Sequence, residues 1–217
     1  MNWSPYRFDI INYLIQDRNY KRYLEIGVND GSCFEKIKCR HKDGVDPGVE
    51  GGKSELVNYP LTSDDFFSKV APHTLPYDII FIDGLHLKDQ VDKDIENSLR
   101  HLNEGGVLVL HDTHPWSERE TRSYEKFLNE GKNNSQRGYW LGTTWQSVLK
   151  LRTESEFLKI KTVMIRNKVD DADVSIVEPT KDRQELYPKT ENMYEYSYFK
   201  QNKEKILNLI SVEEFLG

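Results

Sequence analysis

The sequence predicts an α/β fold with a doubly wound, mostly parallel sheet. Three short apolar runs support this prediction: residues 22–28, 77–84 and 105–112. Continuous apolar runs of this length are typical of strands that are covered on both faces. Helical periodicity and short connections between such runs indicate right-handed βαβ units. With 217 residues, the chain can form one such domain with modest additions.

The first elements are a helix and two strands. Ser4 and Pro5 are typical of a helix start, and apolar residues then recur at helical spacing. The strand at 22–28 follows, and Gly31 opens a short helix after it. A second strand within 39–48 should stop before the Asp-Pro pair at its end, because proline cannot continue a central ladder.

The middle of the chain continues the alternation. Residues 59–62 form a weaker third strand, and residues 77–84 are the clearest strand in the sequence. Between Leu87 and Leu102 the apolar residues recur at intervals of three and four, which predicts a helix that the following glycine pair ends. Residues 105–112 then supply another buried strand.

The pattern changes after Asp112. Residues 113–142 are polar and aromatic and too long for a plain connector, so we expect a substrate loop or lid. A helix at 144–151 and two closing strands at 157–165 and 173–179 complete a domain over residues 1–180. Residues 181–217 form a C-terminal helical extension, with Ser211 and Glu214 spaced as a capping box. The sequence leaves open whether this extension packs on its own sheet or on a second subunit of a homo-oligomer.

Composition narrows the classes of partner. The 30 basic and 36 acidic residues give a net charge of −6 and are interspersed, which argues against nucleic acid as a substrate. Cys33 and Cys39 are too few for a disulfide framework or a zinc site and fit reduced thiols in the cytoplasm. No secretion signal or membrane-spanning apolar run is apparent, so we expect no membrane association.

A glycine-containing loop follows the first strand. Gly27 and Gly31 would let the backbone turn sharply and approach a ligand, although any strand-to-helix turn favours glycine. Asp46 follows Glu25 by 21 residues at the next strand end, where a carboxylate can bind ribose hydroxyls. The acidic loop, which includes Asn29, would repel a pyrophosphate and favours a cationic sulfonium with an amino-acid tail.

Two polar residues follow the weak third strand. Ser63 and Asp64 could hydrogen-bond an adenine, or they could simply cap the next helix. Both readings remain open from the sequence.

Acidic and imidazole side chains follow two further strands. Asp83 and His86 come after one strand, and His111, Asp112 and His114 after another, where open α/β sheets bind their ligands. If the strands are neighbours, the two carboxylates lie ~5 Å apart. The sequence thus suggests a divalent-cation site, Mg²⁺ or similar, at Asp83, His111 and Asp112, with His86 as a general base. Alternatively, these histidines are solvated or structural.

Several motifs together strongly resemble the class I S-adenosylmethionine-dependent methyltransferases, and most closely the bacterial methyltransferase-24-like group. The resemblance covers about residues 20–166 and includes YLEIGVNDG, GVDP, TSDDFF, DIIFIDGLH, LNEGGVLVLHDTHP and GTTWQSVLKLR. It implies a Rossmann-like seven-stranded sheet with an antiparallel edge hairpin. His111 departs from the resemblance, because related metal enzymes often carry a carboxylate there.

The resemblance also implies roles for individual residues. Glu25, Gly27 and Gly31 would line the methionine and ribose portion of S-adenosylmethionine, Asp46 would hold the ribose hydroxyls, and Asp64 would approach the adenine. We expect Asn29, Ser63 and Asp83 to bind the cofactor as well. Asp83 and Asp112 would be metal ligands, and His86 would be the base. The predicted reaction is O-methylation of a small polar acceptor, such as a sugar or other metabolite. The alternatives are an NAD(P)-dependent oxidoreductase, which the missing GxGxxG disfavours, and an inactive nucleoside-binding relative.

Overall fold

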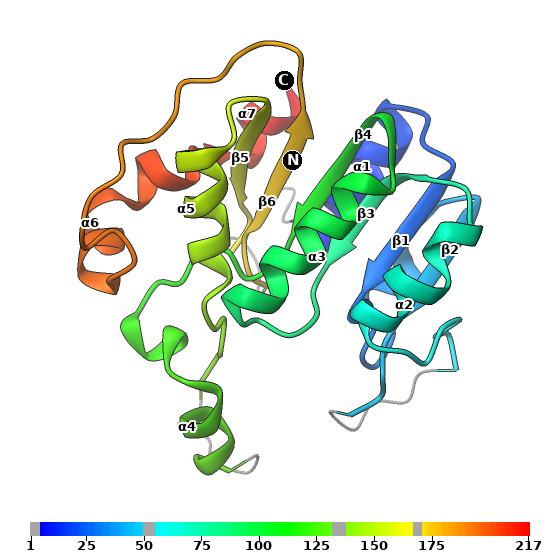
Figure 1. Cartoon of the computed structure of the whole chain (residues 1–217), viewed down its shortest axis with the longest axis horizontal. Helices are drawn as coiled ribbons and strands as arrows, with labels where there is room; N and C mark the ends of the chain where they lie inside the picture. Colours follow the sequence, from blue (N-terminus) through cyan, green and yellow to red (C-terminus); the bar gives the residue numbers. More distant parts are fainter. Residues whose placement is uncertain (1–4, 50–54, 132–137, 167–170) are drawn as a thin grey trace.

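A computed structural model describes residues 5–49, 55–131, 138–166 and 171–217 of the chain. These residues form one sheet in the order β2-β1-β3-β4-β6-β5-β7 (Figure 1). Its first four strands are parallel: β2 (His41–Val45), β1 (Arg22–Ile26), β3 (Tyr77–Ile82) and β4 (Leu102–Leu110). The prediction of a doubly wound α/β sheet is confirmed.

The remaining strands close one side of the sheet. β6 (Val174–Pro179) runs antiparallel to both β4 and β5 (Leu158–Met164), which confirms the predicted hairpin. β7 (Leu209–Ser211), from the C-terminal extension, pairs parallel with β5 at the edge. The predicted strand at 59–62 is wrong, because Tyr59 makes only an isolated parallel bridge to Val45. A proline follows Tyr59 directly, and it cannot donate to a ladder.

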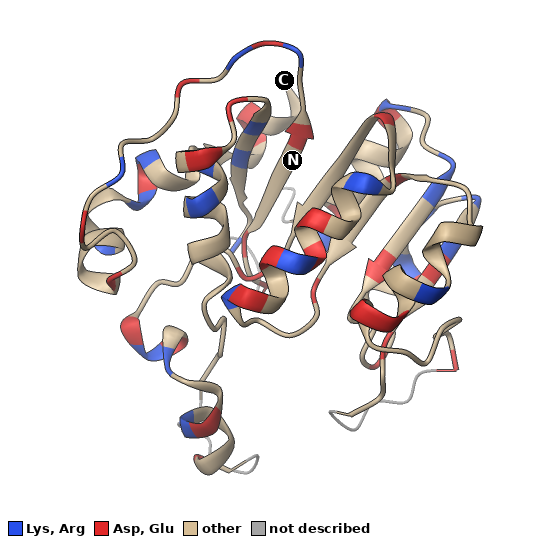
Figure 2. Cartoon of the chain, viewed as in Figure 1, with Lys and Arg blue, Asp and Glu red and all other residues tan. Residues whose placement is uncertain are grey.

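Helices cover both faces of the sheet (Figure 1). One face packs against α1 (Arg7–Asp17), the short helix η1 (Phe34–Lys36) and α7 (Val212–Leu216). The other packs against α2 (Ser63–Lys69), η2 (Ala71–His73), α3 (Lys88–Arg100), α5 (Thr144–Glu154) and α6 (Tyr196–Leu207). Figure 2 shows acidic and basic positions interspersed along α3, whereas α2 has Asp64 and Asp65 in its first turn and Lys69 at its end.

The start of α1 differs from the expectation. Tyr6 is its N-cap, and the Asp9 carboxylate accepts a hydrogen bond from the Tyr6 backbone N at 3.0 Å. The predicted cap residue Ser4 lies outside the described residues. Because Tyr6 is the N-cap, Arg7 lies in the first turn of the helix.

The C-terminal extension packs on the chain's own sheet. Phe199, Ile206 and Leu207 of α6 are fully buried in the same core as α5 and β5. The predicted capping box at the start of α7 is present, because the Ser211 hydroxyl and the Glu214 carboxylate each accept from the other's backbone N.

The segment after β4 contains two short elements, η3 (Glu118–Thr121) and α4 (Tyr124–Asn129). Figure 1 shows α4 beyond the carboxyl ends of the parallel strands. Within the described ranges, no helix combines the length and the apolar character needed to cross a bilayer.

Candidate functional site

Gly27 brings the ends of β1 and β3 together. Its φ is +92°, and a Cβ at this position would lie 2.1 Å from the carbonyl oxygen of Asp83. The Asp83 backbone N in turn donates to the Ile26 carbonyl at 2.8 Å. Any side chain here would force the two strand ends apart, so this glycine sets the shape of the site.

A cavity of about 560 Å³ opens at these strand ends. This volume is within the usual range for a small-molecule site. Gly31 is not among its lining residues and instead shapes the loop, with a φ of +82° and its N donating to the Val28 carbonyl at 2.9 Å. The other predicted cofactor residues do line the cavity: Glu25, Gly27, Asn29, Asp46, Ser63, Asp64 and Asp83.

Asp46 is held at the end of β2 by backbone groups. One carboxylate oxygen accepts from the Asn29 backbone N at 2.8 Å, and the other accepts from the Gly48 backbone N at 2.6 Å. The side chain is only half-buried. Each oxygen keeps a lone pair that could accept a hydrogen bond from a ligand hydroxyl.

Ser63 and Asp64 face the cavity while Thr62 caps α2. The Thr62 hydroxyl accepts from the Asp65 backbone N at 3.2 Å, so the capping role belongs to a neighbour of the predicted pair. The Gln90 amide donates to Ser63, Asp64 and Asp94 at 3.1, 2.9 and 3.1 Å. Gln90 and Asp94 also line the cavity and were not predicted. Burial raises the pKa of Asp94 to about 6.

Glu25 is buried at the centre of this end of the cavity, only 1% exposed, and accepts a hydrogen bond from the Tyr23 hydroxyl. Burial raises its pKa to about 8, and the nearby Asp83 carboxylate acts in the same direction. At neutral pH the Glu25 carboxyl group is therefore largely protonated when no cation is bound nearby. An arriving cation would favour its ionisation.

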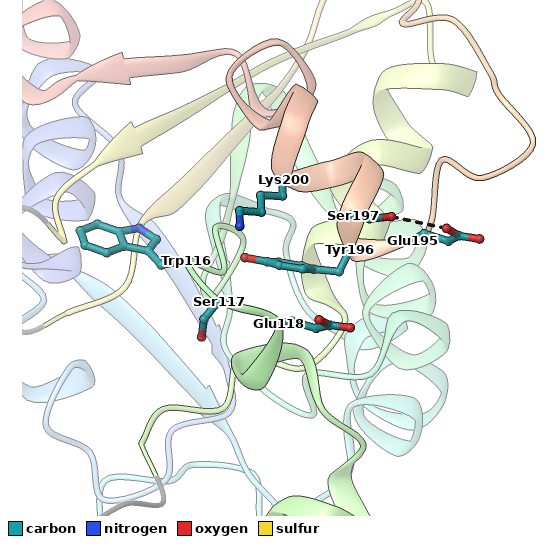
Figure 3. A pocket seen from close by; sticks show the side chains of 7 residues that line it. All are labelled: Trp116, Ser117, Glu118, Glu195, Tyr196, Ser197 and Lys200. Carbon is teal, nitrogen blue, oxygen red and sulfur yellow. Dashed lines mark hydrogen bonds between the residues drawn. The ribbon is translucent and has the colours of Figure 1, made fainter.

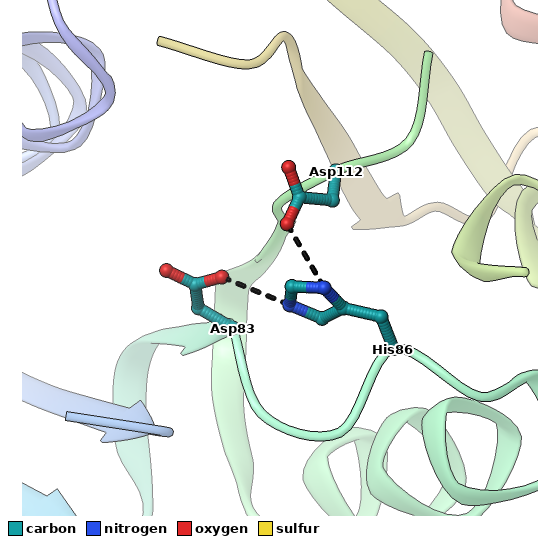
Figure 4. A group of neighbouring side chains, drawn as sticks. All are labelled: Asp83, His86 and Asp112. Carbon is teal, nitrogen blue, oxygen red and sulfur yellow. Dashed lines mark hydrogen bonds and ion pairs between the residues drawn. The ribbon is translucent and has the colours of Figure 1, made fainter. Parts of the chain in front are cut away.

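Asp83, His86 and Asp112 meet at the carboxyl ends of β3 and β4 (Figure 4). His86 lies between the carboxylates, with Nε2 3.3 Å from Asp83 Oδ1 and Nδ1 3.1 Å from Asp112 Oδ2. One possible ligand atom from each residue lies within 4.8 Å of the others. Burial by itself would lower the pKa of His86, but the two carboxylates raise it above its ordinary value.

His111 has a different environment. Its Nδ1 lies 2.9 Å from Asp83 Oδ1 and its Nε2 lies 3.1 Å from Asp171 Oδ1. Burial opposes its charged form, but Asp112 and Asp83 raise its pKa well above the ordinary value. Both ring nitrogens thus face carboxylates, and Nδ1 also lies 3.4 Å from Asp112 Oδ2, so His111 borders the group that Asp83, His86 and Asp112 form.

His114, the other predicted histidine, is buried apart from this cluster. Its Nδ1 lies 2.7 Å from the buried Asp173 carboxylate. Asp173 also accepts from the backbone N of Ile165 and of Arg166, at 2.7 and 2.8 Å. These contacts are those of a structural histidine, which was one of the sequence alternatives.

Arg7 and Asp171 join the site from distant parts of the chain. The Arg7 guanidinium binds Asp171 with 2.5 Å between Nη1 and Oδ1, and its Nε lies 3.7 Å from Asp83 Oδ2. Arg7 also lines the cavity. The two residues are 164 positions apart, and neither belongs to a recognisable motif, so sequence analysis missed both.

An aromatic cluster from the segment after β4 covers His86. The Trp140 ring stacks on the His86 imidazole with 5.5 Å between centroids, and Tyr124 and Phe127 pack against Trp140 at 4.9 and 5.2 Å. Tyr124 also lines the cavity. The described residues of this segment that carry the three rings therefore lie at the site, on the side of the predicted base.

The turn before α5 holds the backbone of His86. Gly142 has a φ of +60°, and a Cβ there would lie 2.0 Å from the His86 carbonyl oxygen. The next residue, Thr143, donates its backbone N to that same carbonyl at 2.8 Å. This close contact fixes the loop that carries His86.

A second concavity, of about 720 Å³, lies between the segment after β4 and the start of α6 (Figure 3). Trp116 and Tyr196 line it with the charged residues Glu118, Glu195 and Lys200. It is lined by none of the predicted site residues. The convergence of predicted ligands at the strand ends makes the 560 Å³ cavity the candidate active site.

Comparisons with known proteins agree with this geometry. A family model described as "Methyltransferase domain" matches residues 42–113, which run from β2 to the residue after Asp112. A putative O-methyltransferase from Klebsiella pneumoniae has a similar structure, with a TM-score of 0.55 at 11% identity over 80% of each chain. A search of curated proteins finds no match.

A second solved structure is the plantazolicin methyltransferase BpumL in complex with a monoazolic desmethylPZN analog and SAH, the demethylated cofactor. It has a TM-score of 0.51 at 13% identity, covering 80% of this chain and 82% of that chain. At these identities the two structures establish likeness of fold. Together with the family match over residues 42–113, they show that this chain is similar to methyltransferases and has their fold.

Proposed function

We propose that the protein transfers a methyl group from S-adenosylmethionine to a hydroxyl oxygen of a small polar acceptor, such as a sugar or other metabolite. The observation that carries this proposal is the cluster of Asp83, His86 and Asp112 beside the cofactor cavity. Carboxylates and an imidazole at the reacting end of the cavity are suited to removing a hydroxyl proton.

The residues of the chain would act mainly by alignment and proton transfer. Cofactor and acceptor must meet in line with the sulfonium methyl, and holding them so supplies much of the rate enhancement. His86 would take the acceptor proton at a ring nitrogen. Asp83 and Asp112, at 3.3 and 3.1 Å from that ring, would stabilise the imidazolium that forms.

The same cluster fits a divalent cation such as Mg²⁺. Two carboxylates and an imidazole with ligand atoms within 4.8 Å are hard and borderline donors of the kind that such ions take. Asp83 and Asp112 would hold the ion, with His86 or the predicted His111 as the third ligand. A bound cation would lower the pKa of the acceptor hydroxyl.

The domain organisation belongs to the same proposal. Residues 1–180 would form the methyltransferase domain, with 113–142 as the substrate loop and 181–217 as an extension. The aromatic cluster on His86 supports the loop assignment, and the concavity of Figure 3 lies where loop and extension meet. The free thiols Cys33 and Cys39 are consistent with a cytoplasmic protein.

A screen of candidate acceptors for methyl transfer tests the proposal, run with and without a chelator. His86→Ala should lower kcat by about 10²- to 10⁴-fold, the usual contribution of a general base, with little change in affinity for S-adenosylhomocysteine. Loss of turnover in chelator that added Mg²⁺ restores would support the metal. Unchanged turnover in the His86 variant would remove this residue from the mechanism.

A further inference from the structure

Charge in the cofactor cavity is distributed unevenly. The methyl donor carries two positive groups, the sulfonium and the α-ammonium, and one negative group, the α-carboxylate. The cavity suits the two cations because its lining is rich in carboxyl groups: Glu25, Asp30, Asp46, Asp64, Asp83 and Asp94. The same lining would repel the α-carboxylate unless a cation is placed to receive it.

Arg7 is such a cation. Among the described residues that line the cavity, only Arg7 and His86 can carry a positive charge. His86 is held between two carboxylates of the reacting cluster. The Arg7 side chain is 24% exposed, and its Nε is buried without a hydrogen-bond partner. Asp83 and Asp171 outweigh its burial and raise its pKa, so Arg7 is charged throughout the working pH range.

Arg7 also lies at the end of the cavity where the amino-acid tail of the cofactor would lie. Ser63 and Asp64, the predicted adenine contacts, lie at the start of α2 on one face of the sheet, and Asp46 lies at the end of β2. Arg7 enters from α1, on the opposite face. A nucleoside bound near Ser63, Asp64 and Asp46 would therefore direct its amino-acid tail toward Arg7.

Asp171 orients this guanidinium. It is 7% exposed, accepts from the Arg7 backbone N at 2.9 Å and pairs with Nη1 at 2.5 Å. The remaining N–H groups keep the planar fork with which arginine binds a carboxylate. The paired Asp171 thus fixes Arg7 toward the cavity.

We propose that Arg7 binds the α-carboxylate of S-adenosylmethionine and so selects the intact amino-acid tail of the cofactor. This inference rests on the methyltransferase function and adds a residue that no motif in the sequence indicates. Glu25 and Asp83 would then face the α-ammonium beside it.

Calorimetry with two donors tests the assignment without any mutation. S-adenosylmethionine and decarboxylated S-adenosylmethionine share the nucleoside, the sulfonium and the amine, and differ only in the carboxylate. We expect the wild-type protein to bind the intact donor about 10- to 100-fold more tightly, as for a charge-assisted hydrogen-bonded pair.

Variants then assign this preference to one side chain. Arg7→Ala should weaken binding of the intact donor by the same factor and leave binding of the decarboxylated donor within about threefold. Arg7→Lys should restore part of the preference, because it keeps the charge and loses the fork. Arg18→Ala is the matched control, since Arg18 caps the other end of α1, pairs with Glu178 and does not line the cavity.

The outcomes separate this inference from the function on which it rests. If the wild-type protein binds neither donor nor S-adenosylhomocysteine, the methyltransferase assignment itself fails. If it binds both donors equally, or if Arg7→Ala weakens both equally while circular dichroism shows a folded protein, the role of Arg7 is overturned. A loss of preference in Arg7→Ala but not in Arg18→Ala supports it.

Discussion

The two halves of the candidate active site are built in different ways. The cofactor half uses residues near one another in the sequence, such as Gly27, Asn29 and Asp46, held by backbone hydrogen bonds at the ends of β1 and β2. The acceptor half is assembled from distant segments, since Trp140 of the segment after β4 stacks on His86. Under the proposed function, short-range backbone geometry would shape the nucleoside side of the cavity, whereas long-range side-chain packing would shape the acceptor side.

Gly27→Ala should have the largest effect, and it tests the cofactor half. The new Cβ would lie 2.1 Å from the Asp83 carbonyl at a φ of +92°, so the ends of β1 and β3 must separate. We expect calorimetry to detect no binding of S-adenosylhomocysteine to the folded variant. Binding at wild-type affinity would mean that this close approach does not shape the pocket.

Gly142→Ala makes the matching change on the acceptor side. Its Cβ would lie 2.0 Å from the His86 carbonyl, which should displace the loop that carries the base. Turnover should fall at least about 100-fold, because a misplacement of about 1 Å can cost that much. The affinity for S-adenosylhomocysteine should change far less than in Gly27→Ala, and an equal loss in both variants would break the comparison.

Trp140→Ala should have a smaller effect on the same side. It removes the ring that stacks on His86 and leaves the carboxylates in place. We expect kcat/KM for the acceptor to fall about tenfold, equivalent to ~1.4 kcal/mol, with cofactor affinity unchanged. Trp116→Ala, at the rim of the other concavity, is a comparison variant that does not touch His86.

Glu25→Gln should have the smallest effect of these substitutions. We expect the effect in the pH dependence of the thermal stability. Folding raises the pKa of Glu25 from 4.5 to about 8. The protonated carboxyl group therefore contributes stability that is fully present below pH 4.5. This contribution is lost as the pH rises through 8. Glutamine does not titrate. The Tm of the variant relative to wild type should therefore rise between pH 5 and pH 9.

The charged and titratable groups around Glu25 include Tyr23, Arg7, Cys33, Lys42 and Asp83, so the comparison is made without ligand and at constant ionic strength. A Tm difference that stays flat with pH would show that Glu25 is ionised throughout. Thermal unfolding monitored by circular dichroism provides the measurement.

The sequence predicts most of the sheet because buried parallel strands are continuous apolar runs, as in residues 77–84. It fails at residues 59–62, where a short apolar stretch contains a proline, and at β7, whose three residues are paired only through tertiary packing. Most of the residues predicted to bind the cofactor line one cavity, and they can be recognised in the sequence because glycine and aspartate have local backbone roles. Arg7 and Asp171 are not, since an ion pair across 164 residues leaves no periodic signal.

The position of β7 has a consequence for the behaviour of the whole molecule. β7 pairs with residues 162–164 of β5 and so covers part of a strand that would otherwise end the sheet. An uncovered strand presents unpaired amide and carbonyl groups that recruit strands from other molecules. The last nine residues thus protect this edge of the sheet from pairing with other molecules. A chain shortened after Asn208 should therefore aggregate as its concentration is raised.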